Sequence, residues 1–321
     1  MGITLITGGH AGLGYEAAMR LAERKQNLVL AGRDLATVEK AAAGLRTRFG
    51  IQVTTVQLDL SSLASVRTAA ADVRRLIAEG RIEPLDALLC NAGAQFVGPI
   101  SYSKDGHEET FAINHLGHFL LVNLLLDTLT ENGRVVCTAS GTHDPETMDG
   151  KLVGKAMEPD AFLLASEGKE GKKPSSGGVR YATSKLCNVL FAYELNRRLA
   201  KRGSRIVSIA YAPGFTPETG LSRTAPAFAR RLLRTKFIKW LFRSLGVTMG
   251  SLSFSGDGLA RLAVDPDYAS EAGQYLQSED GHLVTARSSK VSYDEQRALK
   301  LWKDSETLVK LQPNEMPEGL R

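Results

Sequence analysis

The sequence predicts an α/β protein in which helices cover both faces of a doubly wound, mainly parallel sheet. Short apolar runs suited to buried strands alternate with stretches of helical periodicity, which is typical of such a sheet. The first apolar run leads directly into a glycine-rich turn and then a helix. The chain has 321 residues, of which 43% are hydrophobic, so it can bury a full core as one unit. We therefore expect residues 1–321 to form a single, three-layered domain.

Glycines follow the first expected strand, residues 3–6, at a spacing that suits a ligand-binding turn. Gly8, Gly12 and Gly14 stand where a chain leaving a buried strand must turn tightly and pack a helix closely against the sheet. The N-terminus of that helix could hold a pyrophosphate, because its free N–H groups attract anions. The spacing differs from the commoner dinucleotide fingerprint and from a P-loop. Taken alone, it also fits a tight turn without a ligand.

The remaining elements follow in regular order. Further strands are expected at residues 27–32, 52–58, 85–89, 134–139, 205–211 and 274–277. Helices are expected at residues 35–49, from a Ser-Ser cap at 61–62 to about 78, and at 104–129, 179–202, 259–264 and 292–311, the last closing the chain. Residues 141–178 are rich in Gly, Pro, Lys, Glu and Ser and predict a long surface insertion.

Basic residues gather in one segment. The formal net charge is +5, but residues 219–256 hold seven Lys or Arg and no acidic residue, so the rest of the chain is not basic. On a helical wheel, residues 233–245 combine a wide apolar face with a narrow cationic strip. This pattern fits a lid over an apolar substrate, a helix that docks on a membrane surface, or a core-packing helix. We favour a lid formed by residues 216–256. Nucleic acid is disfavoured, since bases would need a polar reading surface.

The sequence lacks a membrane-spanning run and a metal-binding spacing, which indicates where the protein resides and that it binds no metal. No apolar run approaches the roughly 20 residues of a membrane span, so we expect a soluble, cytoplasmic protein whose peripheral membrane contact would involve residues 230–245. Cys90, Cys137 and Cys187 have neither disulfide nor zinc spacing, and we expect each to be a small buried side chain. His115 and His118 have helical spacing but no third ligand, so we expect structural roles and no metal.

The end of the second expected strand indicates which dinucleotide would bind. In dinucleotide-binding sheets an acidic side chain here accepts hydrogen bonds from a ribose, whereas a basic one suits a 2′-phosphate. Gly32 occupies the expected acid position, and Arg33 follows it. Because a guanidinium can bind a phosphate with two hydrogen bonds, NADP(H) is favoured over NAD(H). Considered singly, Arg33 also fits a solvated arginine at a strand end.

The segment Tyr181-Ala-Thr-Ser-Lys185 is the sharpest chemical signal in the chain. Residues four apart lie on one helix face, so the phenol and the ammonium should be neighbours. We expect the ammonium to favour the phenolate and to lower the tyrosine pKa from about 10 into the range of efficient acid–base catalysis. A surface Tyr–Lys pair of no consequence is the alternative.

Two polar residues accompany this pair. Ser140 ends the expected strand at 134–139 and could bind a substrate oxygen, and Asn114 in a long helix could hold a water that links Lys185 to solvent. Each also fits an ordinary buried contact between a helix and a strand.

Taken together and in this order, these motifs resemble the short-chain dehydrogenase/reductase family over nearly the whole chain. The matching motifs are Thr7-Gly8-x-x-x-Gly12-x-Gly14, Asn91-Ala92-Gly93, Asn114, Ser140, Tyr181-x-x-x-Lys185 and Pro213-Gly214. The resemblance implies a Rossmann-type domain that binds NAD(P)(H). It also implies that Tyr181 exchanges a proton, Lys185 holds the nicotinamide ribose, Ser140 stabilises the reacting oxygen and Asn114 supports the proton path.

The resemblance implies a cofactor site as well. Asp59 would contact adenine, and the nicotinamide would lie beneath Pro213-Gly214. The cofactor-binding residues would be Gly8, His10, Gly12, Leu13, Gly14, Arg33, Asp59, Leu60, Asn91, Ala92, Gly93, Tyr181, Lys185, Pro213, Gly214 and Thr219, the last one place later than is usual in the family.

Within the family, residues 114–121, 184–188 and 301–311 resemble the branch that contains light-dependent protochlorophyllide oxidoreductases, retinol dehydrogenases and WW-domain oxidoreductases. Residues 219–221 and the closing helix point most to the protochlorophyllide enzymes. Two departures count against their photochemistry: Phe215 stands where those enzymes have a cysteine, and Gln95-Phe96 replaces an expected aromatic pair.

The sequence thus predicts an NADP(H)-dependent oxidoreductase that interconverts a carbonyl and an alcohol on an apolar substrate. Light-driven reduction of a tetrapyrrole double bond is the first alternative, and a non-catalytic NADP(H)-binding regulatory module is the second. The insertion at 141–178 lengthens the Ser140–Tyr181 spacing, and family members with comparable insertions tend to be monomers. We therefore expect a monomer.

Overall fold

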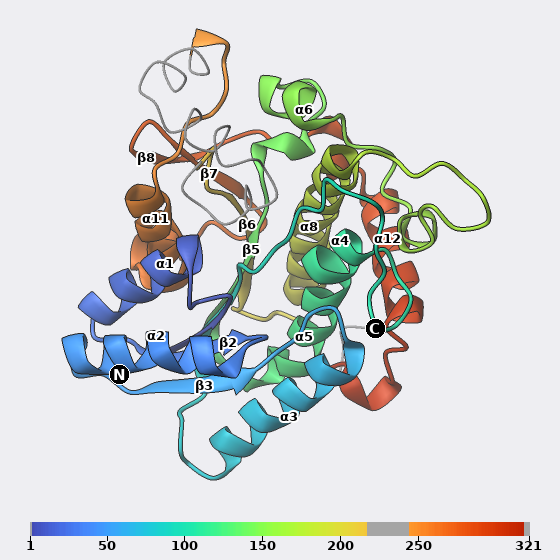
Figure 1. The fold of residues 1–321 in the computed structure, drawn as a ribbon. Coiled ribbons are helices and arrows are strands. Elements are labelled where there is room, and N and C mark those ends of the chain that lie inside the picture. Colours follow the sequence, from blue (N-terminus) through green and yellow to red (C-terminus); the bar gives the residue numbers. More distant parts are fainter. Residues whose placement is uncertain (1, 217–243, 318–321) are drawn as a thin grey trace.

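The computed structural model describes residues 2–216 and 244–317, and its centre is one sheet with helices on both faces (Figure 1). Within this part of the chain the strand order is β3-β2-β1-β4-β5-β6-β7-β8, in which β1 to β7 are parallel and β8 is antiparallel. The strands are β1 Ile3–Thr7, β2 Asn27–Gly32, β3 Val53–Gln57, β4 Leu85–Cys90, β5 Leu129–Thr138, β6 Val207–Ala212, β7 Tyr275–Glu279 and β8 His282–Thr285. The predicted α/β class with a doubly wound parallel sheet is confirmed.

The helices divide into two layers with separate apolar cores. One core packs α1, α2 and α11 against the sheet, and the other packs α3, α5, α8 and α12 against its opposite face (Figure 1). In the described ranges the α-helices are α1 Gly12–Glu23, α2 Leu35–Phe49, α3 Leu63–Ala78, α4 Glu109–Phe111, α5 Gly117–Leu125, α6 Met148–Val153, α7 Ala161–Ala165, α8 Gly177–Lys201, α11 Leu252–Val264 and α12 Glu295–Leu308.

Local chemistry sets these boundaries. All five residues of β1 are buried, as expected for a strand covered on both faces. Asp34 caps α2 by accepting a hydrogen bond from the N–H of Ala36, and Ser62 caps α3 by accepting one from the N–H of Ser65. Gly50 ends α2 in the left-handed conformation that favours glycine.

The long helix expected at 104–129 is wrong at both ends. Residues 102 and 108 form a β-bridge around a turn at Gly106, so the helical segment starts at Glu109. A π-helical turn, Ala112–Leu116, separates α4 from α5. At the other end Leu129 already belongs to β5, which starts five residues before the expected strand.

Other corrections concern short elements. The insertion at 141–178 contains α6 and α7, which are too short to show helical periodicity in the sequence. The helix α11 begins seven residues before its expected start, because Ser251 caps it and the glycines at 256 and 258 obscure its apolar pattern. The antiparallel strand β8 was not expected, although Asp280-Gly281 between β7 and β8 is a hairpin signal.

The strand order defines where a ligand would bind. The chain passes from β1 to β2 and β3 on one side, and then crosses to β4 on the other side of β1. In such sheets the connections leave in opposite directions at this point and open a crevice at the carboxyl ends of the strands. Predicted site residues follow β1, β2, β3, β4, β5 and β6 at this edge, whereas Asn114, Tyr181 and Lys185 lie on helical segments.

Candidate active site

The glycine turn brings the start of α1 to the carboxyl ends of β1 and β4. Gly8 and Gly12 have φ values of 68° and 54°, which residues other than glycine rarely adopt. A Cβ on Gly14 would lie only 2.5 Å from the side-chain amide nitrogen, Nδ2, of Asn91. The N-cap of α1 is Ala11, which has no polar side chain to bind the first N–H groups of the helix. The turn therefore offers these groups to an external anion.

Thr7, at the end of β1, fixes the loop after β4 against this turn. Its Oγ1 accepts hydrogen bonds from the backbone N–H of Asn91, at 2.9 Å, and of Ala92, at 3.0 Å. The side-chain amide of Asn91 donates to the carbonyl oxygen of Thr7 at 3.0 Å. The predicted cofactor residues Asn91 and Ala92 thus lie beside Gly8.

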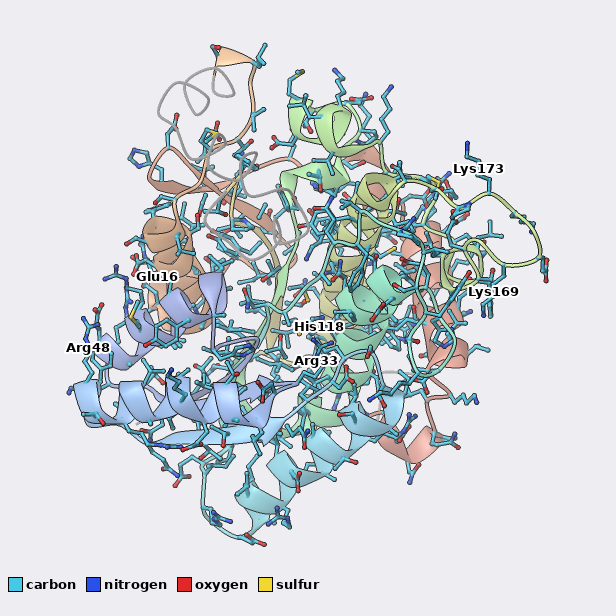
Figure 2. All side chains as sticks on the ribbon, viewed as in Figure 1. Glu16, Arg33, Arg48, His118, Lys169 and Lys173 are labelled. Atoms are coloured by element: carbon cyan, nitrogen blue, oxygen red, sulfur yellow. The ribbon has the colours of Figure 1, made fainter. Side chains whose placement is uncertain are left out.

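The end of β2 carries the predicted phosphate-binding residue. Arg33 is exposed directly after Gly32, and Figure 2 labels it near the centre of the molecule. The imidazole Nδ1 of His10 lies 2.9 Å from the point where Gly32 would carry a Cβ. Any side chain at Gly32 would therefore press on His10, which lies beside the end of β2. The contacts of His10 and Arg33 with a cofactor stay predictions.

Asp59 follows β3 and already has protein partners. Its Oδ1 accepts from the N–H and hydroxyl of Ser61, and its Oδ2 accepts from the ammonium of Lys104 at 2.9 Å. Burial alone would raise the pKa of Asp59, but these bonds outweigh it and lower the pKa. The contact of Asp59 and Leu60 with adenine stays a prediction.

The structure brings Tyr181, Lys185 and Ser140 together. Tyr181 lies in the second turn of α8, and the Lys185 ammonium lies 5.6 Å from the centre of its ring. Both side chains are buried. The ammonium donates a hydrogen bond of 2.8 Å to the carbonyl oxygen of Thr138, at the end of β5. Ser140, two residues later, interacts with the phenol.

The expected lowering of the tyrosine pKa is wrong. Burial raises the pKa of Tyr181 to about 12, and the interaction with Ser140 only partly opposes this. Burial also lowers the pKa of Lys185 to about 8. The free-energy cost of moving a phenolate out of water exceeds the stabilisation that the Lys185 ammonium gives it. This ammonium instead donates its hydrogen bond to the carbonyl of Thr138. At neutral pH the phenol is therefore protonated, which is the form that donates a proton.

Asn114 lies on the π-helical turn, and such turns are frequent at functional sites. Its Oδ1 accepts from the N–H of Ala94 at 2.8 Å, while its Nδ2 donates to the carbonyl of Ala94 and to the hydroxyl of Ser184, both at 2.9 Å. Both amide protons are used by protein atoms, so Oδ1 is the side-chain atom that could still bind the predicted water.

Gly93 leaves room for the approach of two polar groups. A Cβ there would lie 3.2 Å from Asn114 Oδ1 and 3.5 Å from Lys185 Nζ. Both groups therefore border one small space beside the loop that follows β4. Because this space would be filled by any side chain at position 93, glycine is the residue that keeps it open.

Pro213 and Gly214 follow β6 at the same edge. The carbonyl of Pro213 accepts a hydrogen bond of 2.6 Å from the hydroxyl of Ser255, and a Cβ on Gly214 would lie 2.8 Å from the N–H of Gly250. This segment is thus held against the start of α11. The predicted contact at Thr219, and the predicted lid apart from residues 216 and 244–256, lie outside the described residues.

Comparison with known proteins decides the family. Residues 2–147 match the short chain dehydrogenase family. The chain is 34% identical over 328 residues to protochlorophyllide reductase A of Triticum aestivum, covering 97% of this chain and 81% of that protein. It belongs to the short-chain dehydrogenase family. The chain is therefore an oxidoreductase of this family, as its motifs predicted.

Solved structures agree on the fold of this short-chain dehydrogenase. An uncharacterised protein from Mycobacterium paratuberculosis superimposes with a TM-score of 0.69 at 28% identity, covering 97% of this chain and 94% of that one. The angucycline ketoreductase LanV, solved with bound NADP, superimposes with a TM-score of 0.63 at 20% identity, covering 86% and 93%.

Three residues of this short-chain dehydrogenase site were not predicted. Thr138 binds Lys185, Thr142 bonds to the hydroxyl of Ser140 at 3.0 Å, and His143 bonds to the carbonyl of Ser140 at 2.7 Å. The only available signal was their position within three residues of Ser140.

We predicted structural roles for His115 and His118, and a chain without a membrane-spanning segment. Each of His115 and His118 is buried and has its own protein partner: Ser305 for His115, and Thr7 for His118. Within residues 2–216 and 244–317, the helices do not combine the length and the apolar character that crossing a bilayer requires.

Proposed function

We propose that this short-chain dehydrogenase uses NADP(H) to interconvert a carbonyl and an alcohol on an apolar substrate. The observation that carries the proposal is the meeting of Tyr181, Lys185 and Ser140 at the carboxyl edge of the sheet, beside the loop after β4. Burying a phenol beside an ammonium costs free energy of folding, and the pair has no evident role in packing the core.

The residues at the ends of β1 and β2 fit NADP(H). The first turn of α1 offers N–H groups to a pyrophosphate. Arg33 supplies an exposed guanidinium for a 2′-phosphate, and Gly32, at the expected acid position, carries no carboxylate that would repel it. The family relative LanV, solved with bound NADP, is consistent with this choice.

The chain's own residues would carry the proton chemistry. When bound, the nicotinamide supplies or accepts the hydride. Ser140 would bind the substrate oxygen, and the protonated phenol of Tyr181 would donate a proton to it during reduction. The Lys185 ammonium would stabilise the phenolate that remains, and Asn114 would help to return a proton to it.

Apolar side chains around the start of α8 support an apolar substrate. Gly177 packs against the backbone of Val97, and Gly178 packs against Val153 at the end of α6. Val97 and Leu152, which precedes Val153, are each more than half exposed, so both segments that border the start of α8 carry an exposed apolar side chain. The lid at 216–256 and membrane contact through 230–245 stay proposals, as does the monomeric state.

Light-driven reduction of a tetrapyrrole double bond is the second candidate, because the chain is 34% identical to wheat protochlorophyllide reductase A. Phe215, at the position of a cysteine proposed as proton donor in those enzymes, disfavours it. A regulatory module that binds NADP(H) without catalysis is disfavoured by the complete set of Ser140, Tyr181 and Lys185.

One assay distinguishes the three. NADPH consumption is measured in the dark and in light with retinoid, steroid, quinone and tetrapyrrole substrates. Turnover of a carbonyl in the dark supports the proposal, and turnover of protochlorophyllide only in light supports the second candidate. NADPH binding without any turnover would contradict both.

A further inference from the structure

His118 connects three segments of the proposed cofactor site. It lies on α5, is buried, and is labelled near the centre of the molecule in Figure 2. Its Nε2 lies 2.9 Å from Thr7 Oγ1, and its Nδ1 lies 3.2 Å from the carbonyl oxygen of Asn114. The same Oγ1 binds the backbone N–H groups of Asn91 and Ala92.

The partners of the imidazole fix its protonation. A carbonyl oxygen can only accept, so Nδ1 must carry the proton that bonds to Asn114. In the neutral ring Nε2 is then an acceptor. Thr7 Oγ1 already accepts two N–H groups, and its single proton therefore goes to Nε2 at 2.9 Å rather than to the more distant carbonyl of Leu89 at 3.3 Å. Burial, opposed by the bond to the Asn114 carbonyl and helped by the nearby Lys185, lowers the pKa of His118 to about 4, which agrees with a neutral ring.

The result is a directed chain of hydrogen bonds from Thr7 through His118 to Asn114. At one end, Thr7 precedes the glycine turn and holds the loop that contains Asn91. At the other end, the Asn114 side chain holds Ala94 and the hydroxyl of Ser184, the residue before Lys185. We propose that His118 is a positioning residue that sets the glycine turn and the Asn91 loop relative to Asn114. This inference rests on the proposed NADP(H) binding.

His115 provides a matched control on the same helical segment. It is equally buried, and its Nε2 bonds to Ser305 Oγ at 3.0 Å, on α12. Its ring packs among Phe111, Phe119 and Phe191. These contacts join α12 to the core and do not involve the glycine turn or the Asn91 loop.

The test measures NADPH affinity by fluorescence titration, together with the melting temperature. His118→Leu removes both bonds and leaves the Thr7 proton only the more distant carbonyl of Leu89, so we expect NADPH binding to weaken about tenfold. His118→Gln can place an acceptor near the Nε2 position and should bind NADPH nearly as well as wild type. His118→Asn can reach only the Nδ1 position and should behave like His118→Leu. His115→Leu should lower the melting temperature without changing the affinity.

Equal affinity of His118→Leu and wild type would overturn the inference, as would an equal loss in His115→Leu. If His118→Leu does not fold, the NADPH affinities of His118→Gln and His118→Asn are compared instead. Equal affinities of these two variants would overturn the inference. A wild-type protein that binds no NADPH would instead overturn the proposed function, and this inference with it.

Discussion

Lys185→Met should make the protein more stable while abolishing its activity. The Lys185 ammonium is buried, and burial lowers its pKa from 10.5 to about 8. This difference corresponds to about 3 kcal/mol by which the folded protein disfavours the charged form relative to the unfolded chain. At neutral pH the ammonium is charged, so the fold carries this cost.

Methionine removes the charge and keeps most of the volume. The substitution loses the hydrogen bond from the charged Nζ to the carbonyl of Thr138, worth about 2 kcal/mol. That carbonyl keeps the side-chain amide of Asn188 as a donor, at 3.2 Å, so it is not left unsatisfied. The net expectation is a gain of about 1 kcal/mol, which raises the melting temperature by about one to two degrees.

The pH dependence identifies the cause. Below about pH 8 lysine is charged in both states and the full cost is present. As the pH rises from about 8 towards 10.5, the folded protein releases its proton before the unfolded chain does, and the cost disappears. Thermal unfolding followed by circular dichroism should therefore show a stability advantage of Lys185→Met that is largest near neutral pH and shrinks towards about pH 10.

Lys303→Met is the matched control, because Lys303 is exposed on α12. It should change the melting temperature little at any of these pH values. A Lys185→Met protein that is less stable than wild type at neutral pH, or whose advantage does not vary with pH, would refute the reasoning.

Three further predictions concern activity and assembly. Arg33→Asp should shift the preference from NADP(H) towards NAD(H), measured as the ratio of kcat/KM values; an unchanged ratio would show that the phosphate site lies elsewhere. The rate of carbonyl reduction should fall as the pH rises above about 8, because Lys185 loses its charge while Tyr181, with a pKa of about 12, stays protonated; a rate that is flat up to pH 10.5 would contradict this. Light scattering should find a monomer, and a stable tetramer would exclude it.

The sequence predicted the parts of the fold that depend on local pattern. The expected helix at 35–49 matches α2, and strand 27–32 matches β2, because a buried strand and an amphipathic helix each repeat their apolar positions regularly. The helix at 104–129 failed because a β-bridge between residues 102 and 108 and a π-helical turn at residues 112–116 interrupt the regular helix. Such local irregularities leave no periodic trace in the sequence.

The same distinction applies to the site. The spacing of Tyr181 and Lys185 predicted that they are neighbours, because four residues make about one helical turn. It could not predict the tyrosine pKa, which depends on how deeply α8 is buried and on the carbonyl of Thr138 that orients the ammonium. His118 was expected to be structural, but its bond to Thr7 joins residues 111 positions apart and follows only from the fold.

The central claim is that the phenol of Tyr181 exchanges the proton of an NADP(H)-dependent reaction. The most direct measurement compares Tyr181→Phe with wild type, recording NADPH oxidation with a carbonyl substrate and NADPH affinity in parallel. We expect Tyr181→Phe to lose at least about a hundredfold in turnover, because general acid catalysis is removed, while it binds NADPH nearly as tightly as wild type. Turnover close to that of wild type would contradict the account.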